Sequence, residues 1–226
     1  MGGRFFDLSK VNTVLFDFDG TLVDTNELIS DTWHHTVKTL TGHDITEAEI
    51  RRTLGEILQY SMQRLMPEID PEKAIDVYRE YQRSVFLDRI KLFEGVEEVL
   101  SALRAAGHKT AIVTSRLRTS TEKALKHFNL YGLFDTVLTA SDTKIFKPDP
   151  APIYLILDML GSKPEEAILV GDTKHDIEAG LAAGVFTVLV DWSYALPPEN
   201  RANAPAPDAV IEKMKDLLTL LELTGG

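Results

Sequence analysis

One short run of residues constrains this chain more than any other. Residues 14–22 read Val-Leu-Phe-Asp-Phe-Asp-Gly-Thr-Leu, so an apolar strand leads directly into Asp17 and Asp19 before Gly20 turns the backbone. Side chains two apart on a strand share a face, and both carboxylates can therefore reach one pocket. Burying such a pair costs free energy unless a cation compensates. An Asx-type turn at the strand end is the alternative, but the whole string favours an active site in which one carboxylate attacks and its neighbour moves protons.

From Phe93 onward the sequence alternates between helical patterns and short apolar strands. We predict helices over residues 96–106, 120–128, 151–160, 177–183 and 214–223, and strands over residues 109–114, 136–139, 167–170, 185–190 and 209–211. Short apolar strands that alternate with helices indicate a parallel sheet covered on both faces. The predicted fold class is α/β, with a three-layer Rossmann-like core.

The stretch between the first strand and Phe93 has a different character. Residues 26–87 are helical in pattern, with Ile50, Leu54, Leu58, Met62 and Leu65 at helical spacing. We therefore predict a core of residues 1–20 and 93–226, with an α-helical cap of residues 21–92 inserted between strands one and two. An insertion there would hang over the carboxyl ends of the strands, where open α/β sheets bind ligands, and would act as a lid. The alternative is an insertion with no functional role.

Polar residues follow the ends of other predicted strands. Thr114 and Ser115 end strand two, and Asp172 ends strand four. In a Rossmann-type strand order 3-2-1-4-5, the crevice opens between Asp17 and Asp172. Carboxylates that converge there would repel unless a divalent cation lay between them, and oxygen ligands favour Mg²⁺.

Two further features suit a phosphate group, and a third adds to the carboxylates at the crevice. Thr114 and Ser115 offer hydroxyl and backbone N–H groups near a helix start. Lys147 lies in a loop stiffened by prolines and can supply a fixed cation to a carboxylate and a phosphoryl group. Asp176 follows Asp172 by four residues at a strand–helix junction, where helix capping explains one aspartate but not both.

The composition narrows the partners. The net charge of −11 opposes binding to nucleic acid and to anionic membranes. The absence of cysteine excludes disulfides and thiolate zinc sites and suits a reducing compartment. The first six residues lack the apolar core of a signal peptide. We expect a cytoplasmic protein that acts on a small phosphorylated metabolite, as a monomer or weak homodimer.

Taken in order, these motifs resemble those of the haloacid dehalogenase-like hydrolase superfamily. They are D-F-D-G-T-L, V-T-S, a lone K-P and G-D-x-x-x-D. The match is to members with a helical cap, such as phosphoglycolate phosphatases, and residues 26–29 are also similar to a bacterial pyrophosphatase branch. The pair Ser115-Arg116 stands where related phosphatases often carry Asn-Lys or Thr-Lys.

The resemblance implies a role for each motif residue. Asp17 would be the nucleophile that forms an aspartyl-phosphate, and Asp19 the general acid and base. Thr114, Ser115 and Lys147 would hold the phosphoryl group. Mg²⁺ would be held by the Asp17 side chain, the Asp19 backbone carbonyl and Asp172, with Asp176, Gly20 and Asp24 in support.

The predicted function is therefore a Mg²⁺-dependent phosphatase that acts on a small phosphorylated metabolite, similar to phosphoglycolate phosphatase. Inorganic pyrophosphatase is the first alternative, and a hexose-phosphate mutase of the β-phosphoglucomutase type is the second. A receiver-like phospho-acceptor domain is a different class, but receivers are shorter and lack a helical insertion. Asp19 excludes dehalogenation, which has no leaving oxygen to protonate. Substrate preference should depend on cap residues near 55–60, or on Arg116 in the core.

Overall fold

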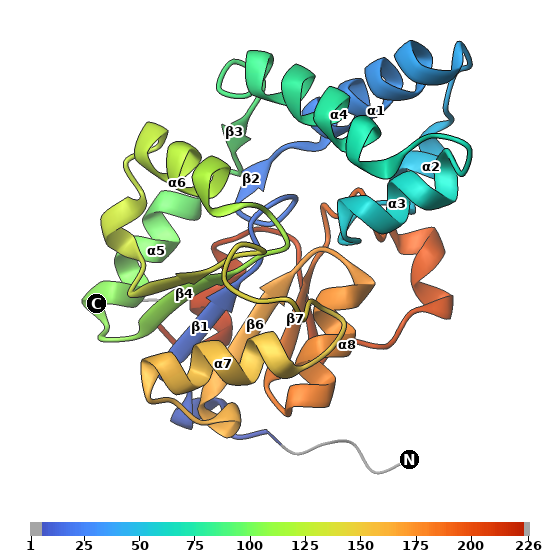
Figure 1. The fold of residues 1–226 in the computed structure, drawn as a ribbon. Coiled ribbons are helices and arrows are strands. Elements are labelled where there is room, and N and C mark those ends of the chain that lie inside the picture. The colour runs from blue at the N-terminus through green and yellow to red at the C-terminus, as the bar shows by residue number, and fades with distance from the viewer. Residues whose placement is uncertain (1–5, 224–226) are drawn as a thin grey trace.

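The computed structural model describes residues 6–223, so the predicted core's outermost residues, 1–5 and 224–226, lie outside it. Within that part of the chain, six parallel strands form one sheet in the order β5-β4-β1-β6-β7-β8 (Figure 1). The strands are β1 (Thr13–Phe16), β4 (Lys109–Val113), β5 (Thr136–Leu138), β6 (Ala167–Gly171), β7 (Phe186–Val190) and β8 (Ala209–Ile211). The predicted order is confirmed, with residues 209–211 at the sheet edge and β1 between β4 and β6.

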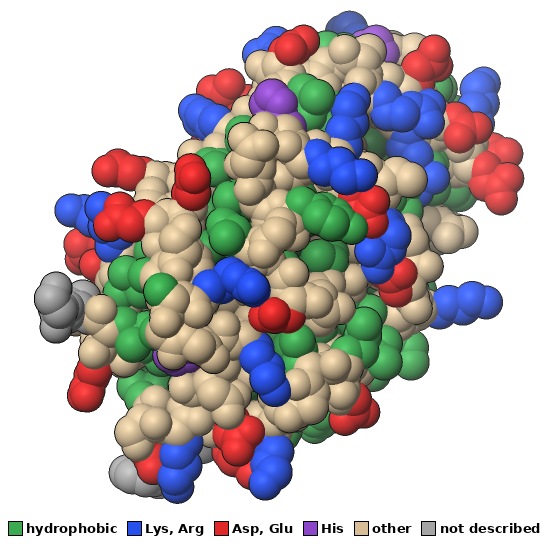
Figure 2. All heavy atoms as spheres, turned by 90° about the vertical axis from the view of Figure 1, so that its left-hand side faces the viewer, with side chains coloured by type: hydrophobic (Ala, Val, Ile, Leu, Met, Phe, Trp, Pro, Cys, Tyr) green, Lys and Arg blue, Asp and Glu red, His purple; other side chains and the backbone are tan. Residues whose placement is uncertain are grey.

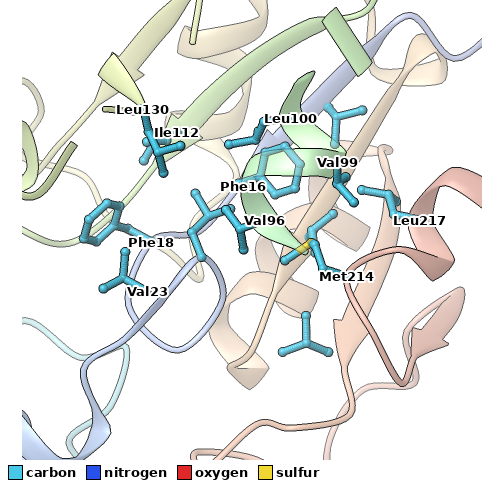
Figure 3. Packing of buried hydrophobic residues seen from close by; sticks show 14 of the residues in the cluster. Phe16, Phe18, Val23, Val96, Val99, Leu100, Ile112, Leu130, Met214 and Leu217 are labelled. Carbon is cyan, nitrogen blue, oxygen red and sulfur yellow. The ribbon is translucent and has the colours of Figure 1, made fainter. Parts of the chain in front are cut away.

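Helices cover both faces of this sheet, as the three-layer prediction requires. They are α5 (Val96–Ala105), α6 (Arg118–His127), α7 (Ala151–Leu160), α8 (Lys174–Ala183) and α9 (Asp216–Leu220), with short 3₁₀ helices at Leu8–Lys10, Tyr131–Leu133, Pro164–Glu166 and Pro198–Asn203. Alternate residues of β1 point to opposite faces. Phe16 packs with residues of α5, α6 and α9, while Leu15 packs with residues of α7 and α8. Figure 3 shows the first of these clusters around Phe16, Leu100 and Met214.

A separate group of helices lies above the sheet in Figure 1. These are α1 (Asn26–Thr41), α2 (Glu47–Arg51), α3 (Leu58–Leu65) and α4 (Pro71–Val85). They pack around their own apolar cluster, which includes Trp33, Met62 and Tyr78. Asp70 caps α4, since its side chain accepts a hydrogen bond from Glu72 N at 3.0 Å. We interpret residues 21–92 as the cap.

Two local features of this segment differ from the sequence expectation. The helical spacing through residues 50–65 predicts continuous helix, but residues 52–57 form a turn between α2 and α3. The two connections between cap and core also pair as short antiparallel strands, β2 (Val23–Asp24) and β3 (Lys91–Leu92). Two residues per strand are too few to show a period of two, so the sequence pattern could not reveal this pair.

Within residues 6–223, no helix is both long and apolar enough to cross a bilayer. On the face shown in Figure 2, basic and acidic side chains are interspersed rather than gathered into one charged surface.

Candidate active site

A cavity of about 300 Å³ lies between the carboxyl ends of the core strands and the cap. Its core side is lined by the predicted site residues Asp17, Asp19, Gly20, Thr114, Ser115, Lys147, Asp172 and Asp176. Its cap side is lined by the turn and the start of α3, over residues 53–59, and by part of α4. The topology explains this gathering, because β1, β4 and β6 are neighbours and their carboxyl ends meet at one edge.

Lys147 links two of the aspartates. Its ammonium group donates hydrogen bonds to Asp17 Oδ1 at 2.7 Å, to Asp176 Oδ1 at 2.5 Å and to the Val113 carbonyl oxygen at 2.8 Å. The lysine side chain is only 6% exposed. An ammonium has three N–H groups, so every donor of Lys147 is engaged and the charge is fixed in place.

Three carboxyl groups crowd next to this lysine. One oxygen from each of Asp17, Asp172 and Asp176 lies within 4.8 Å of the others. Burial, followed by the neighbouring carboxylates, raises the pKa of Asp17 to about 7 against the opposing effect of Lys147. Burial and the charges of Asp17 and Asp176 also raise the pKa of Asp172 well above its usual range. Without a further cation, the cluster therefore favours bound protons over a full set of charges.

The cluster fits a divalent cation. Asp172 Oδ1 is buried and has no hydrogen-bond partner among the described residues, which leaves one carboxylate oxygen free as a ligand. A Cβ on Gly20 would lie 2.3 Å from Asp172 Oδ2, so only glycine leaves room for that carboxylate. The φ of +77° at Gly20 also favours glycine. Hard oxygen donors of this kind suit Mg²⁺.

Asp176 has a different environment from Asp172. Its Oδ2 accepts hydrogen bonds from Thr173 N at 3.0 Å and from Thr173 Oγ1 at 2.6 Å, while its Oδ1 accepts from Lys147. The bond from Thr173 N, together with the one that Asp176 N donates to Thr173 Oγ1 at 3.3 Å, forms a capping box at the start of α8. Both oxygens are thus engaged, and Asp176 positions Lys147 beside Asp17.

The predicted phosphate-binding hydroxyls follow β4. Thr114 is 6% exposed, and its Oγ1 accepts a hydrogen bond from Arg116 N at 3.1 Å. That bond fixes the side chain while leaving the hydroxyl hydrogen available as a donor. Ser115 is half-buried and lines the same cavity.

Asp24, by contrast, is not among the residues that line the cavity in the described part of the chain. It lies in β2, where its Oδ1 accepts a hydrogen bond from Asn26 N at 3.2 Å. Its Oδ2 pairs with Lys91 Nζ at 3.5 Å. The residue therefore joins the two cap–core connections, and any support that it gives the site is indirect.

Sequence reasoning did not reveal what Arg116 and Trp192 do. Arg116 Nη1 donates a hydrogen bond to Asp19 Oδ1 at 2.9 Å, across 97 positions of sequence. Trp192 Nε1 donates to the Gly20 carbonyl oxygen at 3.1 Å and so supports the turn after β1. The sequence offered one signal for the contact between Arg116 and Asp19, because Arg116 stands where related phosphatases often carry lysine. For the contact between Trp192 and Gly20, no sequence pattern links the two positions.

The cap turn comes close to the residues that follow Asp172 at the cavity. A Cβ on Gly55, where φ is +78°, would lie 2.7 Å from His175 Nδ1 and 3.0 Å from Thr173 Oγ1. A second contact joins the cap to the core nearby. There the Tyr194 hydroxyl donates a hydrogen bond to Glu47, and the Arg51 guanidinium lies 4.5 Å from the centre of the Tyr194 ring.

Comparison with known proteins identifies the family to which this chain belongs. A family model described as haloacid dehalogenase-like hydrolase matches residues 14–190. The chain belongs to that family, as its motifs indicate. It is similar to a protein from Bacillus cereus (strain AH820) named pyrophosphatase PpaX, at 37% identity over 94% of this chain and 97% of that protein.

Solved structures agree on the fold. A haloacid dehalogenase-like hydrolase from Bacteroides fragilis superposes with a TM-score of 0.84 at 26% identity, over 92% of this chain and 99% of that one. A predicted phosphoglycolate phosphatase from Haemophilus somnus 129pt gives a TM-score of 0.79 at 23% identity, over 93% and 98%. The second likeness bears on the fold alone.

Proposed function

We propose that this protein is a Mg²⁺-dependent phosphatase that acts on small phosphorylated compounds through a phosphorylated Asp17. The observation that carries the proposal is the pairing of Asp17 with a buried, fully engaged Lys147 beside the free oxygen of Asp172. Burying these charges costs free energy, and a strand end with a purely structural role would not require them. Family membership supports the same chemistry.

The residues divide the reaction into two steps. In the first, an oxygen of Asp17 attacks the phosphorus, the bond to the leaving oxygen breaks, and Asp19 gives that oxygen a proton. In the second, Asp19 takes a proton from a water molecule as the water attacks the same phosphorus. Phosphate then departs and Asp17 is restored. Thr114 and Ser115 bind the phosphoryl oxygens in both steps. Lys147, whose three N–H groups are engaged, supplies a fixed positive charge beside those oxygens.

Asp17, Asp172 and the Asp19 backbone carbonyl would hold Mg²⁺. When bound, the cation supplies charge stabilisation to the phosphoryl oxygens. It also lets Asp17 stay ionised despite the burial that raises its pKa. Lys147 contributes to the same end, since its ammonium is fixed by three acceptors and lies 2.7 Å from Asp17 Oδ1.

Pyrophosphate is the substrate that the comparisons favour. The B. cereus relative named pyrophosphatase PpaX aligns with nearly the whole chain. A cavity of about 300 Å³ suits a molecule of this size. Phosphoglycolate stays a prediction from the motif resemblance.

The test is a pair of substitutions assayed with Mg²⁺ on pyrophosphate and on p-nitrophenyl phosphate. Asp17→Asn should reduce turnover of both to background, because an amide does not attack phosphorus. Asp19→Asn should lower turnover of pyrophosphate by about 10²–10⁴-fold through loss of proton transfer. Asp44→Asn changes an aspartate that is 78% exposed on the cap and serves as the matched control. Wild-type rates in Asp17→Asn would refute the proposal.

A further inference from the structure

The Arg116 guanidinium has more hydrogen-bond donors than the structure uses. The side chain is 7% exposed and lines the cavity. Its Nη1 is bonded to Asp19, and its Cζ lies 4.4 Å from the centre of the Phe86 ring. Its Nε and Nη2 are buried and have no hydrogen-bond partner among the described residues.

These two free donors form a defined binding element. The Nε–H and Nη2–H groups lie on one edge of the planar guanidinium and point the same way. That edge matches two oxygens of a phosphate or carboxylate, which is the geometry of bidentate arginine pairs. Leaving buried donors of a charged group unpaired costs free energy. An anion that used both would remove this cost.

The charges around the cavity show why Arg116 is free for this purpose. Lys147 is committed to Asp17, Asp176 and the Val113 carbonyl. Arg116, in contrast, uses only Nη1, which donates its hydrogen bond to Asp19. On the cap side, Arg79 of α4 lines the same cavity. The residues around Lys147 suffice to bind one phosphoryl group. The free edge of Arg116 is therefore available to a second anionic group.

We propose that Arg116 binds a phosphate or carboxylate carried by the leaving group of the substrate, and that the enzyme selects small phosphates whose leaving group bears such an anionic group before the bond to phosphorus breaks. The inference rests on the proposed function. One guanidinium would then hold Asp19 through Nη1 and the leaving group through Nε and Nη2. The proton of Asp19 would pass to the bridging oxygen as its bond to the attacked phosphorus breaks. The departing phosphate would leave from Arg116.

Three substrates separate this role from simpler ones. Pyrophosphate has an anionic leaving group that needs a proton, and glycerol 2-phosphate has an uncharged one that also needs a proton. The nitrophenolate of p-nitrophenyl phosphate leaves without one. Arg116→Gln should lower kcat/KM for pyrophosphate about 10–100-fold, as expected for lost hydrogen bonds to a charged group. The other two substrates should lose about threefold at most, which is the part that Arg116 contributes by holding Asp19. Arg116→Lys keeps the charge but lacks the two-donor edge, and should fall in between.

A binding measurement makes the test independent of turnover. Methylenediphosphonate, which resembles pyrophosphate but is not hydrolysed, should inhibit Arg116→Gln with a Ki raised by a similar factor. Arg104→Gln removes a half-exposed arginine that pairs with Asp135 outside the cavity, and it should leave every value unchanged. Circular dichroism and thermal unfolding establish that Arg116→Gln is folded.

Two outcomes would overturn the inference. If glycerol 2-phosphate loses as much as pyrophosphate, Arg116 acts only by positioning Asp19. If all three substrates fall equally and the Ki is unchanged, Arg116 is structural. Neither result touches the proposed function, which the Asp17→Asn variant tests separately.

Discussion

The core side and the cap side of the cavity present different kinds of side chain. The core contributes buried charge, with Asp17, Asp172 and Lys147 all less than a tenth exposed. The cap contributes a turn whose side chains are mainly half-buried. Its one acidic residue at the cavity, Glu56, is already bonded to Ser61 Oγ at 2.7 Å and Arg64 Nη2 at 2.6 Å.

The difference follows from what holds each side in place. Strand ends in a parallel sheet are fixed by hydrogen bonds to their neighbours, so groups placed there can be aligned closely enough for chemistry. The cap turn is attached to a separate apolar cluster, and the two cap–core connections pair over two residues each. Such a turn can change its side chains without disturbing the buried charges. We infer that the core fixes the reaction and the cap tunes the substrate.

Removing the cation should have the largest effect and should act on the core alone. With EDTA, we expect hydrolysis of pyrophosphate and of p-nitrophenyl phosphate to stop, and excess Mg²⁺ to restore both. Ca²⁺ should not restore them, because it prefers more ligands and longer bonds and would misplace the phosphoryl group relative to Asp17. Full activity in a preparation shown by elemental analysis to be metal-free would remove the basis for the metal site.

Changing the cap turn should have a smaller and more selective effect. Ile57→Ala and Gln59→Ala alter side chains that line the cavity. We expect each to change the ratio of kcat/KM between pyrophosphate and phosphoglycolate by about tenfold, with less change on p-nitrophenyl phosphate. Tyr60→Ala, at a side chain 63% exposed to solvent, is the control. An unchanged preference in both variants would show that selection lies in the core, and the lid would lose its functional meaning.

The smallest expected effect is a change with pH in the free energy of unfolding. Because the pKa of Asp17 is raised to about 7 and that of Asp172 is also raised, the folded protein holds protons that the unfolded chain has lost. This contribution is complete below the ordinary aspartate pKa of about 3.9 and is lost as pH rises through about 7. In EDTA, urea unfolding should therefore show lower stability at pH 8 than at pH 5.

Two comparisons sharpen that measurement. Asp172→Asn should flatten the pH dependence, because the amide buries no charge. Mg²⁺ should add more stability at pH 8 than at pH 5, since the cation replaces the protons. A rise in stability between pH 5 and pH 8 in the metal-free protein would contradict the raised pKa values.

The core could be predicted from sequence because its signals are local and its topology is restricted. Each predicted strand is found within about a residue of its expected bounds. The central strands β1, β4, β6 and β7 each hold four or five consecutive buried, mainly apolar residues, a pattern that leaves little freedom. Asp17, Thr114 and Asp172 follow the ends of three such strands, and the strand order then predicted that they meet at one edge of the sheet. The cap was predicted less well. Leu54 and Leu58 keep helical spacing across the turn, while Gly55, with a φ of +78°, lies outside helical geometry.

The long-range partners of the site could not be predicted in the same way. The contact between Arg116 and Asp19 depends on where two loops end, and Phe86 beneath the guanidinium comes from a third segment. The pair formed by Tyr194 and Glu47 depends on how the cap rests on the core. These contacts are set by tertiary packing, which a residue period does not encode.

The central claim is that Asp17 carries the phosphoryl group during turnover. The direct measurement is rapid acid quench of enzyme mixed with Mg²⁺ and excess pyrophosphate, followed by mass spectrometry of the peptide that contains Asp17. We predict one added phosphoryl group on Asp17 within the first turnover. It should accumulate in Asp19→Asn if that variant slows the water step more than the first step, and it should be absent from Asp17→Asn. Rapid decay in water marks a phosphatase, whereas a phosphorylated Asp17 that survives until a sugar phosphate is added marks a mutase. Full turnover with Asp17 never phosphorylated at any quench time would contradict the account.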